Sequence, residues 1–403
     1  MRCGGVGGRE NLLAERVGFE PTERFPVHSI SSAASSATPA PLRTQKGTIN
    51  HKHNTAVKRP ALIRLHEAIP AMLFSSTIMK RTVPLAIFIL FISTVTIGQS
   101  GPQLNRNPEM VKFVTSDIGN FWQAYDLAAK ETDKAKRIAI FQTEYLDKGS
   151  PGLKDFLRLR IRSAENLVNT IDRMPKYYAS IRPQTLQVQR MEKRMREAFR
   201  KFKSIYPEAV FPDVYFVIGV LSSGGTTGQS GLLIGTEMYG KTEKTPMDEL
   251  SAWLRVVLSN VENVPAIVAH ESCHYNQRYS TAQDQRHLLS KALQEGACDT
   301  IGELISGRNI NEHLKVYGKT HDAELWRDFE AAMYKPDFSN WVYNASKAKD
   351  RPADLGYYMG YLITRAYYKN AKDKSKAIYD ILNIQDARAF YEASGVRNKT
   401  DGK

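Results

Sequence analysis

The stretch that most constrains the fold is PAIVAHESCHY at residues 265–275, where two histidines stand four residues apart behind an apolar run. Positions i and i+4 lie on one face of an α-helix, so His270 and His274 can bind one small cation and Glu271 can act on a water bound to it. The apolar residues before them favour a buried helix whose polar face lines a cleft. A catalytic zinc ion has three protein ligands and a water. The fold must therefore bring a third ligand to this helix from another element.

A second polar pair lies further along the chain, in the apolar-periodic stretch QEGACD at residues 294–299. Glu295 and Asp299 are also four residues apart, so a helix places them on one face. Glu295 can bind the metal, while Asp299 can accept a hydrogen bond from the second ring nitrogen of a ligand histidine. A polar seam between packed helices, with each group satisfied by hydrogen bonds, has the same residue pattern and is the alternative.

The two motifs together resemble those of a known class of enzymes. HESCH, followed after twenty residues by EGACD, resembles the gluzincin arrangement of zinc metallopeptidases, in which HExxH precedes ExxxD on a later helix. More narrowly, the chain is similar to a bacterial family of predicted zinc-dependent proteases related to gliding-motility proteins. That similarity extends from FVTSDIGNFWQAYD to LGYYMGYLITRAYY and covers most of residues 110–370. Cys273 and Cys298, one in each motif, depart from the usual pattern.

The resemblance implies a zincin-like fold and a site with assigned roles. One zinc ion per chain would be bound by His270, His274 and Glu295. Glu271 would be the general base, and Asp299 would be the hydrogen-bond partner of a ligand histidine. On this basis we expect an exported zinc metallopeptidase that hydrolyses a peptide or protein substrate through a zinc-bound water. The alternative is a non-catalytic exported binding or assembly protein with a zincin fold, related to gliding or secretion.

A tyrosine near the C-terminal end is the expected source of a further catalytic group. On a helix over LGYYMGYLITRAYY, Tyr357 and Tyr361 are an i, i+4 pair. Gly356 and Gly360 flank the pair and permit close approach of another backbone. A phenol beside zinc can donate a hydrogen bond to the oxyanion that forms during hydrolysis. The family's Gly-Tyr pattern favours Tyr357 over Tyr361 for this role, and tyrosines used only for packing are the alternative.

The cysteines within the motifs carry a separate hypothesis. Cys273 and Cys298 each stand three residues after a metal-binding position, so two helices that share a zinc ion would bring their sulfurs close together. Export permits a disulfide between them. Buried free thiols that pack as small apolar groups are an alternative, and zinc ligation by Cys273 is another. The remaining histidines of this region lack partner spacing and are expected to be surface or structural residues: His287, His313 and His321.

The chain divides into five parts. Residues 1–78 show no sustained period and are expected to be a mis-called or disordered extension. Residues 79–100, MKRTVPLAIFILFISTVTIGQS, are typical of a signal peptide. Residues 101–206 are predicted to form a helical N-terminal region and residues 207–394 the zincin-like catalytic region. Residues 395–403 are a polar tail.

The signal peptide predicts an exported protein, periplasmic or extracellular. An uncleaved apolar run at residues 83–97 would instead anchor the protein to the inner membrane. A membrane partner is expected only through that segment. The net charge is +14, from 56 Lys and Arg against 42 Asp and Glu, but the charges are interspersed, as in MEKRMREAFRKFK. A mildly basic solvated surface and no nucleic-acid partner are therefore expected. The sequence leaves the oligomeric state open.

The expected fold class is α+β, mostly helical, with a small sheet just before the HESCH helix. VYFVIGVL and LLIGTEMYG are rich in β-branched and aromatic residues and predict two short strands. Between them GGTTGQSG is expected to be a flexible turn.

Overall fold

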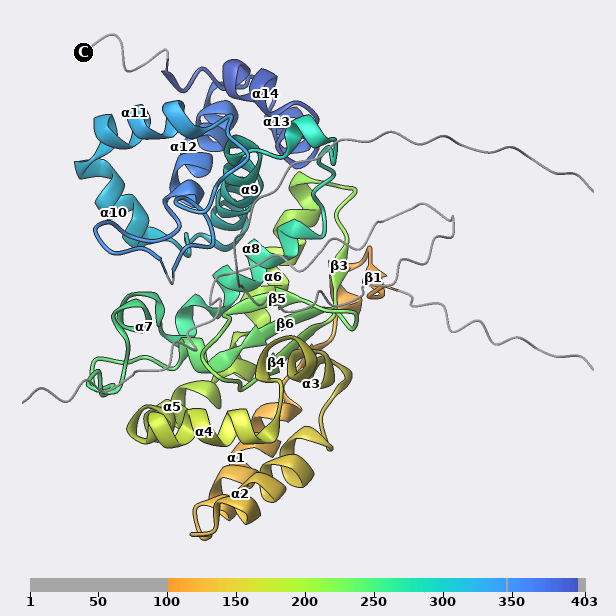
Figure 1. Cartoon of the computed structure of the whole chain (residues 1–403). Coiled ribbons are helices and arrows are strands. Elements are labelled where there is room, and N and C mark those ends of the chain that lie inside the picture. The colour runs from red at the N-terminus through yellow and green to blue at the C-terminus, as the bar shows by residue number, and fades with distance from the viewer. Residues whose placement is uncertain (1–100, 346, 398–403) are drawn as a thin grey trace, which may run out of the picture. The chain divides into compact units, whose positions relative to one another are not determined.

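The computed structural model of the chain describes residues 101–345 and 347–397 (Figure 1). Over these residues the fold is α+β and mostly helical, with two small sheets, which confirms the predicted fold class at that level. The predicted extension at residues 1–78 and the predicted signal peptide at residues 79–100 lie outside the described part of the chain.

The α-helices are α1 (Ser116–Ala128), α2 (Lys134–Phe141), α3 (Pro151–Phe156), α4 (Ala164–Arg173), α5 (Pro175–Thr185), α6 (Glu192–Ile205), α7 (Ala252–Val257), α8 (Val264–His274), α9 (Leu288–Ser306), α10 (Glu312–Thr320), α11 (Asp322–Ala332), α12 (Leu355–Asn370), α13 (Lys374–Leu382) and α14 (Ala387–Ser394). Short 3-10 turns are η1 (Pro108–Met110), η4 (Val188–Met191), η5 (Thr236–Tyr239), η6 (Val261–Asn263) and η7 (Gln283–Gln285). Two π-helical turns, η2 (Gln142–Leu146) and η3 (Leu157–Ile161), extend α2 and α3.

The main sheet has four strands in the order β2 (Phe113–Val114), β4 (Val214–Val217), β6 (Leu232–Gly235) and β5 (Gly225–Thr227). β2, β4 and β6 are parallel, and β5 is antiparallel to β6 at the edge. Every residue of β4 and β6 is buried. Continuous apolar strands of this kind need cover on both faces, and α3 and α8 both pack against β6. A separate pair joins β1 (Leu104–Asn105) to β3 (Phe211–Pro212).

The Gly-rich stretch differs from the sequence-based expectation. Instead of one flexible turn, it contains strand β5 and a tight hairpin to β6, closed by the Gly228 amide, which donates to the carbonyl of Gly231 at 2.8 Å. Gly231 has a φ of 148°, a conformation that side chains disfavour. The two predicted strands, β4 and β6, run parallel to each other, and the β-branched pair Thr226 and Thr227 belongs to the edge strand β5.

The helical N-terminal region is built into the same sheet. Its strand β2 pairs in parallel with β4, and the paired residues Phe113 and Val214 are about a hundred residues apart in the sequence. Helix α6 packs against both α8 and α9. Residues 101–206 thus support the helices that carry the two motifs.

Helices α8, α9 and α12 are in close contact, and glycines set their spacing. A Cβ atom on Gly360 would lie 1.7 Å from the carbonyl oxygen of Ala292, so α12 crosses α9 backbone to backbone. On the other side of α9, a Cβ atom on Gly302 would lie 3.3 Å from the Cα of His270 on α8. These close approaches hold the HESCH and EGACD motifs next to each other.

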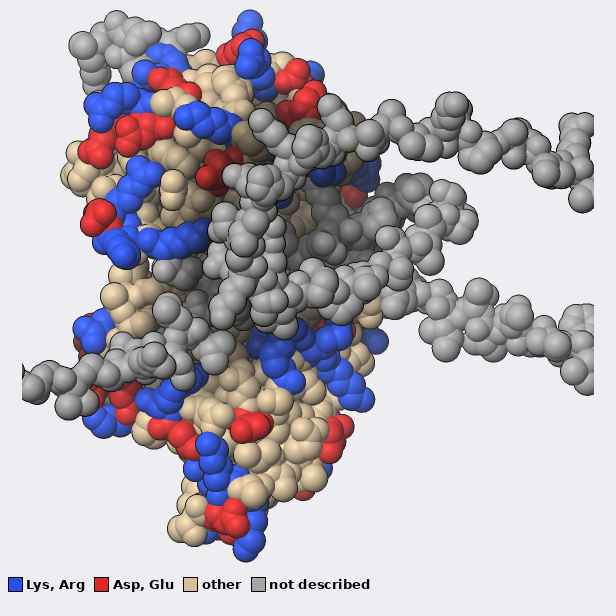
Figure 2. Space-filling model, in the orientation of Figure 1, with Lys and Arg blue, Asp and Glu red and all other residues tan. Residues whose placement is uncertain are grey.

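The visible surface carries charges of both signs. Figure 2 shows Lys and Arg side chains interspersed with Asp and Glu over the described part of this face. Among the described helices, none is both long and apolar enough to cross a bilayer.

Candidate metal centre

Helix α8 carries the HESCH motif in a buried position. Pro265 stands in its first turn, where a missing amide hydrogen costs nothing, and every residue from Val264 to Cys273 is buried. His270 is 3% exposed and Glu271 is 6% exposed, so both polar side chains are shielded from solvent. A buried polar face of this kind requires partners, because an unpaired buried charge is strongly destabilising.

The partners come from α9. Glu295 Oε2 lies 3.6 Å from His270 Nε2 and 3.4 Å from His274 Nε2. The three ligand atoms all lie within 4.8 Å of one another. His270, His274 and Glu295 therefore form a group that can hold a metal ion, and it is the one such group among the residues that the structure describes. Two imidazoles and one carboxylate suit zinc and neighbouring first-row ions.

Both histidines direct Nε2 toward Glu295, because an oxygen atom of another side chain lies next to each Nδ1. His270 Nδ1 lies 2.9 Å from Asp299 Oδ1. His274 Nδ1 lies 2.9 Å from Gln277 Oε1, and the amide of Gln277 donates to the carbonyl of Gln294 at 2.6 Å. Metal-binding histidines are commonly oriented through the other ring nitrogen in this way. Asp299 stands in the position that the sequence assigns to it, whereas Gln277 was missed; it follows His274 by three residues.

The pKa values of the three proposed ligands are set by two opposing effects: burial, and the charges of the neighbouring ligands. Burial by itself lowers the pKa of His274, but the neighbouring Glu295 carboxylate outweighs it and raises the pKa to about 9. The pKa of His270 is also raised well above its usual range, since Asp299 and Glu295 outweigh its burial. Burial acts to raise the pKa of Glu295, and the two histidines lower it instead. A bound cation would replace the protons that otherwise join these groups.

Glu271 lies between α8 and the edge of the sheet. Burial raises its pKa, against the lowering effect of the two histidines. A Cβ atom on Gly225 of β5 would lie 2.7 Å from both Cγ and Oε1 of Glu271. The backbone of the edge strand is therefore packed directly against this carboxyl group.

Tyr343 is a site residue that the sequence did not reveal. Its hydroxyl donates a 2.6 Å hydrogen bond to Glu295 Oε1, the oxygen that faces away from the histidines. The residue lies between α11 and α12 with a φ of 56°. Reciprocal hydrogen bonds between Asn344 and Asp354 hold this segment in place. No periodicity or motif marks Tyr343, because its position depends on an irregular loop.

Tyr357 lies beside the centre, but Tyr361 does not. The Tyr357 ring stacks on that of His270, with centroids 6.3 Å apart and an interplanar angle of 17°. It is 3% exposed, and burial raises its pKa well above the usual range. The Tyr361 ring instead lies under the ammonium group of Lys315 at 4.5 Å. Of the predicted pair, the structure thus brings only Tyr357 to the histidines, in contact with a ligand ring.

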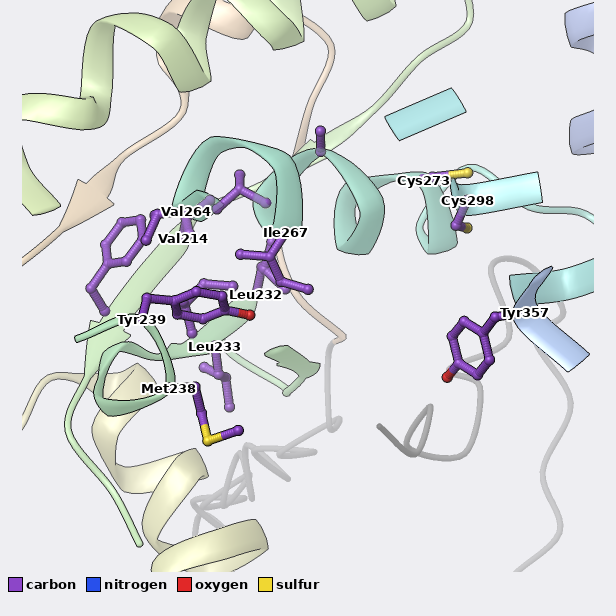
Figure 3. Close-up of a cluster of buried hydrophobic side chains, with 14 of the residues drawn as sticks. Val214, Leu232, Leu233, Met238, Tyr239, Val264, Ile267, Cys273, Cys298 and Tyr357 are labelled. Atoms are coloured by element: carbon purple, nitrogen blue, oxygen red, sulfur yellow. The ribbon is translucent and has the colours of Figure 1, made fainter. Parts of the chain in front are cut away.

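The two cysteines are free thiols in the structure and both are buried. They lie on the facing helices α8 and α9 (Figure 3). Cys298 Sγ lies 3.3 Å from His274 Nδ1. This is the arrangement of the free-thiol alternative.

The other histidines lie apart from the group. His287 precedes α9 and its Nδ1 accepts from the Ser290 amide at 3.3 Å. His321 stacks on Tyr317 with centroids 3.9 Å apart. His313, on α10, lines a cavity considered below.

Comparison with known proteins decides the family. The family model of the gliding motility protein GldB matches residues 109–398. The chain belongs to this family. No curated protein and no solved structure matches it.

Membership of the GldB family corrects the expectation drawn from the gluzincin resemblance. The matching family is one of gliding motility proteins and not of metallopeptidases, so the prediction of a zinc metallopeptidase that hydrolyses peptide bonds is wrong. The physical reason is that two i, i+4 pairs on facing helices specify the geometry of a metal site, not turnover at that site. The GldB family agrees with the coarser prediction of a protein exported to the cell envelope.

Proposed function

We propose that this chain is a non-catalytic binding or assembly protein of the gliding machinery, with a zincin-like helix pair that holds one zinc ion. The observation that carries this proposal is the convergence of His270, His274 and Glu295 within 4.8 Å in a chain of the GldB family. Zinc is the ion that this donor set suits best.

In this proposal the metal has a structural purpose. His270 and His274 come from α8 and Glu295 from α9, so a shared ion would fasten the two helices to each other. Binding free energy at such a site contributes directly to folding. The carboxylate of Asp299 and the side-chain oxygen of Gln277, which face the Nδ1 atoms of the two histidines, and the hydrogen bond that Tyr343 donates to Glu295 would keep the ligands in one orientation and limit exchange of the ion.

Glu271 has a packing role in this proposal. Its carboxyl group sits against Gly225 of the edge strand, so it connects the metal-binding helix to the main sheet. Its negative charge also offsets the cationic centre formed by the ion and the two histidines.

We place the protein in the periplasm or at the cell surface, with residues 79–100 directing export. If the apolar run at residues 83–97 were retained, it would anchor the chain to the inner membrane. The partner would be another protein of the gliding machinery rather than a nucleic acid, because the charges of the chain are mixed in sign.

The experiment combines zinc content with gliding of cells that carry the variant in place of the wild type. Glu271→Gln keeps the size of the side chain and all three proposed ligands, so it should retain zinc and support gliding. His274→Ala should lose zinc and gliding together, while His321→Ala, a histidine outside the centre, should lose neither. Zinc retained with gliding abolished in Glu271→Gln would point to chemistry at this carboxylate and overturn the non-catalytic role. Wild-type protein purified without a stoichiometric metal would overturn the zinc assignment.

A further inference from the structure

A cavity of about 510 Å³ lies beside the metal-binding group. Its walls come from α7, the first turns of α8, the end of α9, the loop into α10 and the start of α12. Figure 1 shows α7 and α10 on the same side of the molecule. Small-molecule sites in proteins have volumes of roughly 300–1,000 Å³, so this cavity has the capacity of a ligand site.

The charges on the cavity wall are already matched. Lys315 Nζ lies 2.7 Å from Glu303 and 3.3 Å from Glu312. Arg308 donates to the side chain of Asn263 at 3.2 Å, and the partly buried carboxyl of Asp354 accepts from the backbone amide of Asn344 at 3.1 Å. With two cationic side chains against three carboxyl groups, the wall has no surplus positive charge for an anionic ligand.

The neutral polar groups of the wall are suited to hydroxyl groups. Three asparagines line the cavity: Asn263, Asn309 and Asn311. Each uses part of its carboxamide within the protein, since Asn263 accepts from Arg308, Asn309 donates to Glu303 and Asn311 donates to Asp299. A carboxamide offers two donors and an acceptor, which complement a hydroxyl group that donates and accepts. His313 adds a ring that is neutral at neutral pH, because burial lowers its pKa.

Two aromatic rings complete the wall. Tyr239 at the end of η5 and Tyr357 on α12 both line the cavity, and Figure 3 shows their rings extending toward each other from opposite sides. Tyr239 and Tyr357 are 7% and 3% exposed, so each contributes a small aromatic surface to the wall rather than an open face. Mixed amides, balanced charges and this limited aromatic surface together favour a neutral, polyhydroxylated ligand over an anion or a purely apolar molecule.

The cavity is also connected to the proposed metal ligands. The carboxamide of Asn311 donates to both oxygens of Asp299, at 2.9 and 3.2 Å. Asp299 in turn lies 2.9 Å from His270 Nδ1. Tyr357 makes a second connection, because its ring stacks on His270. A ligand that engages Asn311 or Tyr357 therefore acts on groups that orient a metal ligand.

We propose that this cavity binds a neutral saccharide and that saccharide and metal binding are coupled through Asn311, Asp299 and His270. The saccharide site stands on the cavity alone, whereas the coupling rests on the zinc site proposed above. Coupling of this kind is reciprocal: each ligand strengthens or weakens the other by the same factor.

The chain offers a matched pair of variants to test the site. Val256 on α7 lines the cavity and is 58% exposed, so a tryptophan there would occupy the cavity without disturbing the core. Val316 on α10 is 64% exposed and lies outside the lining, so Val316→Trp is the control. Binding is measured by titration calorimetry with tetrasaccharides of β-1,4-linked N-acetylglucosamine, cellobiose-type glucose and maltose-type glucose, and with inorganic phosphate as an anionic control.

At least one tetrasaccharide should bind the wild type and Val316→Trp with a Kd below about 1 mM. Val256→Trp should weaken that binding at least about tenfold, and phosphate should not compete. No saccharide binding by the wild type, or equal binding by the two variants, would overturn the saccharide site. Zinc content measured on the same samples keeps this result separate from the zinc proposal, because a zinc-loaded protein that binds no saccharide refutes only the cavity.

The coupling is tested by repeating the titration after the metal is removed with a chelator. The saccharide Kd should change by at least about fivefold in the wild type. In Asn311→Ala, which breaks the connection to Asp299, the same removal should change it less than about twofold. Equal effects of metal removal in wild type and Asn311→Ala would refute the route through Asn311, and no effect in the wild type would refute the coupling; either result leaves the site itself standing.

Discussion

The metal-binding group and the cavity beside it share walls but are built from opposite kinds of polar surface. In the former, His270 and Glu295 are 3% and 1% exposed, and the ionisable groups depend on one another and on a few neutral partners such as Tyr343. In the latter, Lys315 and its carboxylate partners are partly exposed and the wall is supplemented by neutral amides. Asp299 belongs to the first and is hydrogen-bonded to the second. In a buried polar cluster, removal of one group leaves its partners unpaired and strongly lowers the free energy of unfolding. In a solvated wall, water can replace a lost partner, so a single substitution has a small effect.

The largest effect is expected from removing a buried ligand. His274→Ala or Glu295→Ala should abolish stoichiometric zinc binding and lower the free energy of unfolding by about 3–5 kcal/mol, since the remaining partners stay buried and unpaired. Elemental analysis and chemical denaturation measure the two effects. Asp299→Ala should keep most of the zinc at high metal concentration, with affinity reduced about 10–100-fold. If Asp299→Ala lost the metal while Glu295→Ala kept it, the ligand assignment would be reversed.

The second effect is a pH dependence with opposite signs for the metal-free and metal-bound protein. The pKa of His274 is raised from 6.5 to about 9 in the metal-free fold. Its contribution to stability is therefore fully present below pH 6.5 and is lost as the pH rises through about 9. That loss is on the order of 2 kcal/mol or more for this one group. Zinc requires neutral imidazole, so zinc affinity should instead increase over the same range.

Melting temperatures recorded from pH 6 to 9.5, with chelator and with zinc, would measure this contrast. Chelator-treated protein should become less stable with rising pH, and the zinc-induced increase in melting temperature should grow. A metal-free protein whose stability rises across this range would contradict the raised pKa of His274. The lining of the cavity contains one histidine, His313, and no buried histidine pair, so with zinc kept saturating, saccharide binding should vary little over the same pH range.

The third effect concerns the packing of α12, which forms a wall of both regions. Gly360→Ala places a methyl group 1.7 Å from the Ala292 carbonyl oxygen, so the helices must separate, at a cost of about 1–3 kcal/mol. Gly119→Ala is the matched control, because that glycine lies within α1 with nothing within 4 Å of the added methyl group. It should stabilise the protein by about 0.5–1 kcal/mol. Denaturant titrations that gave the two variants equal stability would show that the α9–α12 contact is looser than described.

The smallest effect separates the two tyrosines near the centre. Tyr343→Phe removes a 2.6 Å hydrogen bond to Glu295, so zinc affinity should fall about tenfold, corresponding to about 1.4 kcal/mol. Tyr357→Phe keeps the ring that stacks on His270 and should change zinc affinity less than about threefold. Competition with a zinc-binding dye measures both variants. A larger effect in Tyr357→Phe would mean that its hydroxyl, rather than that of Tyr343, supports the ligand.

The sequence alone was sufficient to predict which side chains share one face of a helix. His270 with His274, and Glu295 with Asp299, are four residues apart, and an α-helix of fixed pitch places each pair on one face whatever surrounds it. The need for a third ligand and the resemblance to HExxH–ExxxD motifs predicted the partnership of the two helices, and the missing side chain of Gly360 predicted a close backbone approach. That resemblance also led to the wrong activity, because ligand spacing is common to metal sites that turn over substrate and those that do not.

Features that depend on contacts between segments far apart in the sequence were decided only by the tertiary structure. Contacts made by an edge strand or an irregular loop leave no period in the sequence, so the packing of β5 against Glu271 and the hydrogen bond from the Tyr343 hydroxyl to Glu295 could not be foreseen. The parallel pairing of β4 with β6 likewise depends on long-range register rather than on local propensity. The cavity at Asn311 exists only because α7, α9, α10 and α12 converge there, and that convergence is fixed by packing of side chains far apart in the chain.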